Sequence, residues 1–102
     1  MNLRSLFGRG RPVRVHLLLK GRIGEGWFDI DRTLRLAEGA TLRDLLDEAE
    51  RQGIALRETI AKSPHLRDTL MINGDRCALD EHLDRVMSDG DEVYLLSPLA
   101  GG

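Results

Sequence analysis

Hydrophobic and polar residues alternate from Val13 to Lys20, the first regular stretch of the chain. A period of two predicts a strand with one buried face. Leu18 departs from the pattern, because it is an apolar residue on the otherwise polar side. The residues predicted to face the core are Val13, Val15, Leu17 and Leu19.

The next stretch predicts a strand that returns along the first one as a long hairpin. Glycines within residues 21–26 mark the reversal. Arg32 interrupts the apolar face of the returning strand. We therefore expect an irregularity near Asp31 and Arg32, and a more regular strand over residues 33–36. The apolar residues that share this face are Phe28, Ile30, Leu34 and Leu36.

The spacing of apolar residues then changes to that of a helix, predicted over residues 42–52. Thr41 is suited to cap its first turn, and Asp44 completes a weakened capping box, in which Glu or Gln is the usual partner. Gly53 ends the helix. The apolar stripe consists of Leu42, Leu45, Leu46 and Ala49.

The second half of the chain predicts a short helix over residues 54–62, a strand over 69–73 and a return strand over 75–78. The Asn-Gly pair between these strands is the strongest short hairpin signal. Residues 79–88 show no clear period and are expected to form a loop with a short turn of helix. A final apolar strand is predicted from residue 92 to about 97.

A hairpin, a helix that crosses over and then further strands are typical of an α+β domain. The continuous apolar run from Val93 to Leu96 suits a central strand. A right-handed crossover places this strand beside the first one. The predicted fold is a β-grasp (ubiquitin-like) roll, with a mixed sheet of four to five strands and one main helix packed on one face.

Composition limits the classes of partner. The 102 residues are 41% hydrophobic and 31% charged, which is typical of a single folded domain. A net charge of -2 gives no reason to expect nucleic acid or an anionic membrane as a partner. No apolar run is long enough to span a bilayer. The single cysteine excludes an internal disulfide and a cysteine-based zinc cluster, and indicates a cytoplasmic protein.

Candidate metal and nucleotide sites are weak. His16, His65 and His82 lie at no metal-ligand spacing, and His16 is expected to be solvated. Cys77 is expected to pack in the interior, as free cysteines commonly do. The glycines of residues 21–26 lack the following helix and the Gly-Lys-Ser/Thr signature of a phosphate-binding loop.

Both ends of the chain are predicted to lie outside the domain, which spans residues 13–96. Residues 1–12 are basic and too poor in apolar residues for a secretory signal, so we interpret them as a flexible leader. Residues 97–102 form an extended tail that can reach about 20 Å. Two terminal glycines alone do not separate a functional tail from a frayed end.

The final strand opens with Asp-Gly-Asp-Glu-Val at residues 89–93, and the chain ends in Ser-Pro-Leu-Ala-Gly-Gly. Both segments resemble the MoaD/ThiS family of ubiquitin-like sulfur carriers, whose members typically end in Pro-Pro-hydrophobic-small-Gly-Gly. Ser97 stands in place of the first proline. Glu-Gly-Ala-Thr-Leu at residues 38–42 and Ile-Asn-Gly at 72–74 support the resemblance, which covers residues 13–102.

The resemblance implies a carrier protein and co-substrate that is not itself an enzyme and binds no cofactor. A ubiquitin-activating-type adenylyltransferase would use ATP and Mg²⁺ to convert the Gly102 carboxylate into an acyl-adenylate. Sulfur from a cysteine persulfide would then produce a C-terminal thiocarboxylate, which donates sulfur to an acceptor on a second protein. The resemblance implies that a partner's active site receives Pro98, Leu99, Ala100, Gly101 and Gly102.

Period two also places Leu18, Tyr94 and Leu96 on the outer face of two neighbouring strands. We interpret them as a docking patch for partners, since contiguous exposed apolar residues commonly mark an interaction surface. Isolated exposed apolar residues are the alternative interpretation.

Within the family we favour the molybdopterin pathway over the thiamine pathway, because the chain has an extra helix after Gly53 and a leader. The second partner would then be the large subunit of a molybdopterin synthase. Two other classes remain open: a ubiquitin-like modifier joined to lysines, and a non-covalent β-grasp interaction domain.

Overall fold

We describe the fold from a computed structural model of the chain, over residues 11–23, 26–62, 66 and 69–96. Most of the predicted leader and all of the predicted tail lie outside these residues. The elements in chain order are β1 (Val13–Ile23), β2 (Gly26–Leu36), α2 (Leu42–Arg51), α3 (Leu56–Lys62), β3 (Leu70–Ile72), β4 (Asp75–Cys77), the 3-10 helix η1 (Leu79–Glu81) and β5 (Glu92–Leu96).

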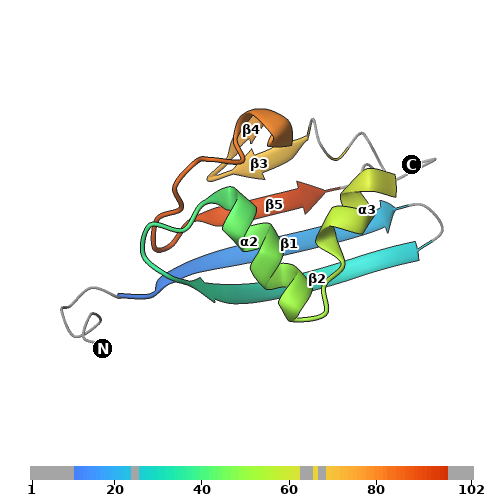
Figure 1. Ribbon diagram of the computed structural model, residues 1–102. Helices are drawn as coiled ribbons and strands as arrows, with labels where there is room; N and C mark the ends of the chain where they lie inside the picture. The colour runs from blue at the N-terminus through green and yellow to red at the C-terminus, as the bar shows by residue number, and fades with distance from the viewer. Residues whose placement is uncertain (1–10, 24–25, 63–65, 67–68, 97–102) are drawn as a thin grey trace.

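The strands form one five-stranded sheet in the order β2-β1-β5-β3-β4. The last strand, β5, lies at its centre, parallel to β1 and antiparallel to β3. Helices α2 and α3 both lie on one face of this sheet (Figure 1). This arrangement is the predicted α+β β-grasp fold, including the parallel pairing of the first and last strands.

The hairpin of β1 and β2 is longer and more regular than predicted. Its register is unbroken from the Val13–Leu36 pair to the Ile23–Gly26 pair, so the predicted irregularity near Arg32 is wrong. Gly21 does not begin the reversal, because it lies within β1 with a φ of 119°. Glycine adopts this dihedral without the steric cost that a Cβ adds, so the strand continues through it.

Arg32 interrupts the apolar pattern because β2 is an edge strand. Arg32 is paired with Leu17, on the side of the sheet that carries the core, yet its side chain is exposed. A charged side chain on the inward side of an edge strand opposes pairing with the edge of another molecule. Phe28 and Ile30 on the same side of β2 are only half-buried and pack against the core.

The N-terminus of α2 forms the predicted capping box. The Thr41 side chain accepts a hydrogen bond from the Asp44 amide, and Asp44 Oδ2 accepts one from the Thr41 amide at 2.8 Å. An aspartate therefore serves where glutamate is usual. The helix ends at Arg51, and Gly53 follows its last turn as predicted.

The remaining elements also agree with the sequence pattern. Asn73 and Gly74 have φ values of 53° and 88°, which a tight turn of this hairpin class requires at both central positions. The predicted helical turn in the following loop is η1. Cys77 packs against the core from β4, and burial raises the pKa of its thiol.

The core lies between the sheet and the two helices. Within the described residues, no helix is long and apolar enough to cross a membrane. The largest fully buried side chains are those of Val15, Leu17, Leu19, Leu34, Leu42, Leu45, Leu56, Leu66, Leu70, Ile72, Val93 and Leu95.

We predict that Arg32→Leu increases self-association. The substitution removes the inward-facing charge from a long exposed edge, while Phe28 and Ile30 remain available to a second edge. Light scattering after size exclusion should give a higher mean mass at high concentration for this variant than for the wild type. Arg35→Leu, on the outward side of the same strand, is the matched control. An Arg32→Leu chain as monomeric as the wild type would contradict this role.

Candidate functional site

The tail departs from the end of the central strand. Leu96 is the last residue of β5 and is paired with Lys20 of β1. Val93 and Leu95 are each 1% exposed and anchor β5 in the core. The residues predicted to carry the chemistry lie outside the described part of the chain: Pro98, Leu99, Ala100, Gly101 and Gly102.

A buried carboxylate holds the start of β5. Asp91 is 7% exposed, and its Oδ1 accepts a hydrogen bond from Asn73 Nδ2 while its Oδ2 accepts one from the Ser88 amide, each at 2.8 Å. Asn73 Oδ1 in turn accepts from the Glu92 amide at 2.9 Å. Both carboxylate oxygens therefore have donors, and the turn between β3 and β4 is tied to the beginning of β5.

The same segment is tied to β1. The His16 amide donates to the Asp91 carbonyl at 2.9 Å, and the Gly90 amide donates to the Arg14 carbonyl at 2.8 Å. The Arg14 amide donates to Asp89 Oδ1 at 2.8 Å, and this bond together with the Arg14 guanidinium lowers the pKa of Asp89 below its usual value. The Asp-Gly-Asp-Glu segment thus sets the position of β5 against both of its neighbours.

The predicted docking residues share the sheet face opposite the helices. Leu18 and Tyr94 are direct partners in the parallel ladder, and both are half-buried. Leu96 is 41% exposed. The predicted placement of all three on one outer face therefore agrees with the register, and their role in docking stays a prediction.

Two apolar residues of this outer face were missed from the sequence. Met71 of β3 is paired with Tyr94 and is half-buried. Its position between Leu70 and Ile72, which face the core, was sufficient to predict that Met71 faces outward. Trp27 at the start of β2 is 65% exposed. Its placement depends on the length of the hairpin, which the glycines at residues 21–26 obscured.

Residues 22–102 match the model of the ThiS family. This match spans most of the chain, from the end of β1 through the final strand and the terminal glycines. The chain belongs to the ThiS family. Members of this family are small ubiquitin-like sulfur carriers rather than enzymes, and they interact with activating and sulfur-acceptor enzymes. No curated protein and no solved structure matched the chain.

His16 of this ThiS-family chain is not simply solvated, as the sequence suggested. Its Nε2 lies 2.5 Å from Asp31 Oδ1, and its side chain is 30% exposed. The rings of His16 and Tyr94 meet edge to face with centroids 5.8 Å apart. Burial, and then the carboxylates of Glu92 and Asp31, raise the pKa of Tyr94. The phenol at the centre of the outer face is therefore neutral at physiological pH.

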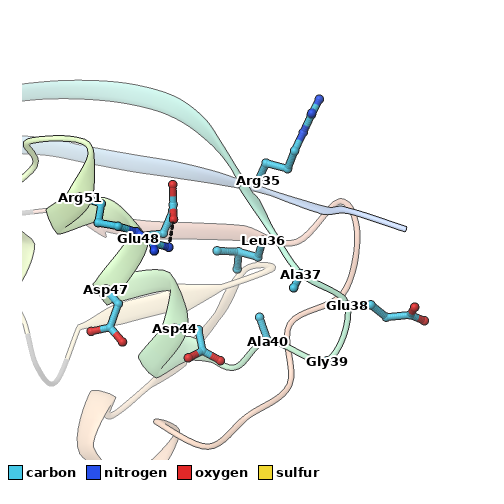
Figure 2. A pocket seen from close by; sticks show the side chains of 10 residues that line it. All are labelled: Arg35, Leu36, Ala37, Glu38, Gly39, Ala40, Asp44, Asp47, Glu48 and Arg51. Carbon is cyan, nitrogen blue, oxygen red and sulfur yellow. Dashed lines mark hydrogen bonds and ion pairs between the residues drawn. The ribbon is translucent and has the colours of Figure 1, made fainter. Parts of the chain in front are cut away.

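A polar hollow of about 490 Å³ lies beside α2 and the end of β2 (Figure 2). Leu36 in its wall is paired with Val13, so the hollow is at the sheet end opposite Leu96. Three of its charged groups stabilise the helix: Asp44 belongs to the capping box, and Glu48 contacts Arg51 (Figure 2). The lining residues are Arg35, Leu36, Ala37, Glu38, Gly39, Ala40, Asp44, Asp47, Glu48 and Arg51.

In the part of the chain that the structure describes, no three His, Cys, Asp or Glu side chains lie close enough together to hold a metal ion. His82 is engaged locally, with Nδ1 at 2.9 Å from the Ala78 carbonyl. His65 lies outside the described residues.

We predict that Asp91→Ala destabilises the domain by about 1–3 kcal/mol, because it removes the buried carboxylate that accepts part-buried hydrogen bonds from the Asn73 side chain and the Ser88 amide. Asn73→Ala should cost a similar amount, and the double variant should lose less than the sum of the two. Urea unfolding measures all three. Asp84→Ala, which breaks an exposed ion pair with Arg43, is the control and should stay within about 0.5 kcal/mol of the wild type. Equal losses for the Asp91 and Asp84 variants would refute the anchoring role.

We predict that Asp89 makes stability depend on acidic pH. Because folding lowers the pKa of Asp89, its stabilisation is complete above the unfolded-state pKa of about 3.9. It is then lost as pH falls through the folded-state pKa. The stability difference between the wild type and Asp89→Asn should therefore narrow on acidification from pH 6, as urea unfolding at a series of pH values measures. A difference that stays constant with pH would contradict the assignment.

Proposed function

We propose that this chain is a sulfur carrier whose terminal Gly102 is adenylated, converted to a thiocarboxylate and used to donate sulfur in cofactor biosynthesis. The observation that carries the proposal is the family match, which extends to Gly102 and includes the final strand and tail. The proposed reaction takes place in the cytoplasm, where the free Cys77 stays reduced.

The chemistry asks little of the chain itself. A carboxylate is a poor electrophile, because its charge is delocalised and its leaving group would be oxide. In the proposed scheme, an adenylyltransferase uses ATP and Mg²⁺ to attach AMP to the Gly102 carboxylate. A persulfide sulfur attacks the acyl carbon and AMP leaves, which gives an acyl disulfide. A thiol then attacks the donor cysteine sulfur of this disulfide, a new disulfide forms with the donor, and the thiocarboxylate leaves. ATP and Mg²⁺ belong to the partner, and the carrier supplies the acyl group.

The fold supports delivery of that group because the base of the tail is fixed. Val93 and Leu95 are buried, and the Asp91 cluster holds the start of β5. The chain after Leu96 can extend by about 20 Å from this fixed point. The two final glycines have no Cβ, so they suit a narrow channel in a partner. A fixed base with an extended end suits presentation of one carboxylate to successive enzymes.

We propose that Leu18, Tyr94 and Leu96 form the docking patch for these enzymes. The three residues lie on the helix-free outer face, on the strand that leads into the tail and on its neighbour. Met71 continues the apolar row beyond Tyr94. A partner that takes the tail can cover this patch in the same complex.

We favour the molybdopterin pathway, in which the second partner is a large synthase subunit and the carrier is its small subunit. The helix α3 after Gly53 supports this preference, since thiamine-pathway carriers are typically leaner. Sulfur transfer to a thiazole precursor instead of a molybdopterin precursor would redirect the assignment to thiamine.

The central prediction is a sulfur-for-oxygen exchange at Gly102. Mass spectrometry of the chain from its native host should show the corresponding mass increase on the C-terminal peptide. Deletion of Gly101 and Gly102 should abolish sulfur transfer, and Gly102→Ala should slow adenylation, while circular dichroism and thermal unfolding stay unchanged. Lysine-linked adducts in place of the exchange would indicate a protein modifier. Full function after the deletion would indicate a non-covalent interaction domain.

A further inference from the structure

Trp27 is the chain's one tryptophan and the most exposed large apolar side chain in the described residues, at 65%. It lies at the start of β2 and is paired with Arg22, on the outer face of the sheet. An indole buries roughly 150–250 Å² in a packed setting and is enriched among residues that dominate binding energy. Among the described residues, nothing accounts for this exposed position.

The sheet register places Trp27 beside the point where the tail departs. Asp29, Lys20 and Leu96 form one row across β2, β1 and β5. The next pair on the same face, Arg22 and Trp27, lies two residues further along β1, towards the end of the sheet at which β5 stops. With strands about 4.8 Å apart and a rise of about 3.3 Å per residue, the Trp27 Cα lies about 12 Å from that of Leu96.

The tail can extend by at most about 20 Å. An enzyme that acts on Gly102 therefore has to come close to the base of the tail. A standard interface covers about 800 Å² on each partner, a disc of about 16 Å radius. A disc of that size centred on Leu96 includes Trp27 if it extends over the outer face.

The two sides of the sheet differ in what they offer such a footprint. The outer face carries Leu96, which is 41% exposed, and the half-buried Leu18 and Tyr94. On the other side, α3 lies near the same end of the sheet (Figure 1). Its exposed charged residues are Arg57, Glu58 and Lys62. Burial of apolar surface stabilises a complex, whereas desolvation of charged side chains costs free energy. The footprint of the enzyme is therefore expected to extend over the outer face.

We propose that Trp27 is an anchor residue for the adenylyltransferase, whose apolar pocket beside the tail channel receives the indole. This inference rests on the proposed function. The terminal glycines offer the enzyme no side chain to recognise, so contacts with the domain add to the selection of this carrier.

The first test is ATP–pyrophosphate exchange by the adenylyltransferase of the same host, with the full-length carrier as the varied substrate. Trp27→Ala should raise the KM for the carrier about tenfold or more and leave kcat unchanged, because the contact is the same in the ground and transition states. Trp27→Phe should restore part of the loss. Val86→Ala is the matched control, because Val86 is 58% exposed but pairs with Thr41, at the sheet end away from the tail.

A direct readout uses the single tryptophan. Incorporation of 5-fluorotryptophan gives the carrier one ¹⁹F resonance, which should shift on addition of the unlabelled enzyme. A resonance that stays unchanged while exchange proceeds would overturn the anchor. A resonance that shifts with the carrier's own concentration would point to self-association and also overturn it.

The outcomes separate the two proposals. If the wild type supports exchange and Trp27→Ala matches its KM, the anchor is wrong and the carrier function stands. If the wild type supports no exchange, the proposed function fails and the anchor fails with it. A KM that rises equally for Trp27→Ala and Val86→Ala would mean a general loss of exposed apolar surface and would also refute a specific anchor.

Discussion

The position of the final strand depends on one buried carboxylate. Asp91 bonds the Asn73 side chain with one oxygen and the Ser88 amide with the other, and its carbonyl accepts from His16 of β1. These bonds fix β5 against β3 and β1 together. The side-chain period of a strand is two, so a slip by one residue would carry Val93 and Leu95 out of the core. The outward direction of Tyr94 therefore follows from the same bonds.

Residues 89–92, which carry part of the family resemblance, have a structural role. Asp89 and Gly90 bond Arg14, and Glu92 bonds Asn73, so residues 89–92 connect three strands. None of these groups is placed to react with a substrate at the far end of β5. They affect the proposed chemistry only by position, because they determine where β5 ends and in which direction the chain leaves the sheet.

Local patterns predicted much of the fold, and long-range relations explain the errors. The capping box at Thr41, the Asn73–Gly74 turn and the alternation of β1 are properties of neighbouring residues, so the sequence reveals them. Arg32 suggested a break because alternation cannot tell an edge strand from an inner one. The bond between Asn73 and Asp91 was not predictable, because no periodicity relates two turns that meet only in the folded sheet. Leu18, Tyr94 and Leu96 were placed correctly by period two, whereas the chemistry of Gly102 rests on the resemblance.

The inner strands β1 and β5 serve two purposes with alternate residues. Leu17 and Val93 are partners on the core side, and Leu18 and Tyr94 are partners on the outer side. The core residues account for the stability of the domain, since they lose their contact with water on folding. The outer residues keep part of that contact in the isolated chain, so the apolar surface that is still exposed remains available to a complex. Stability and partner binding can therefore be changed separately along the same strands, which suits a carrier that meets several enzymes on one rigid fold.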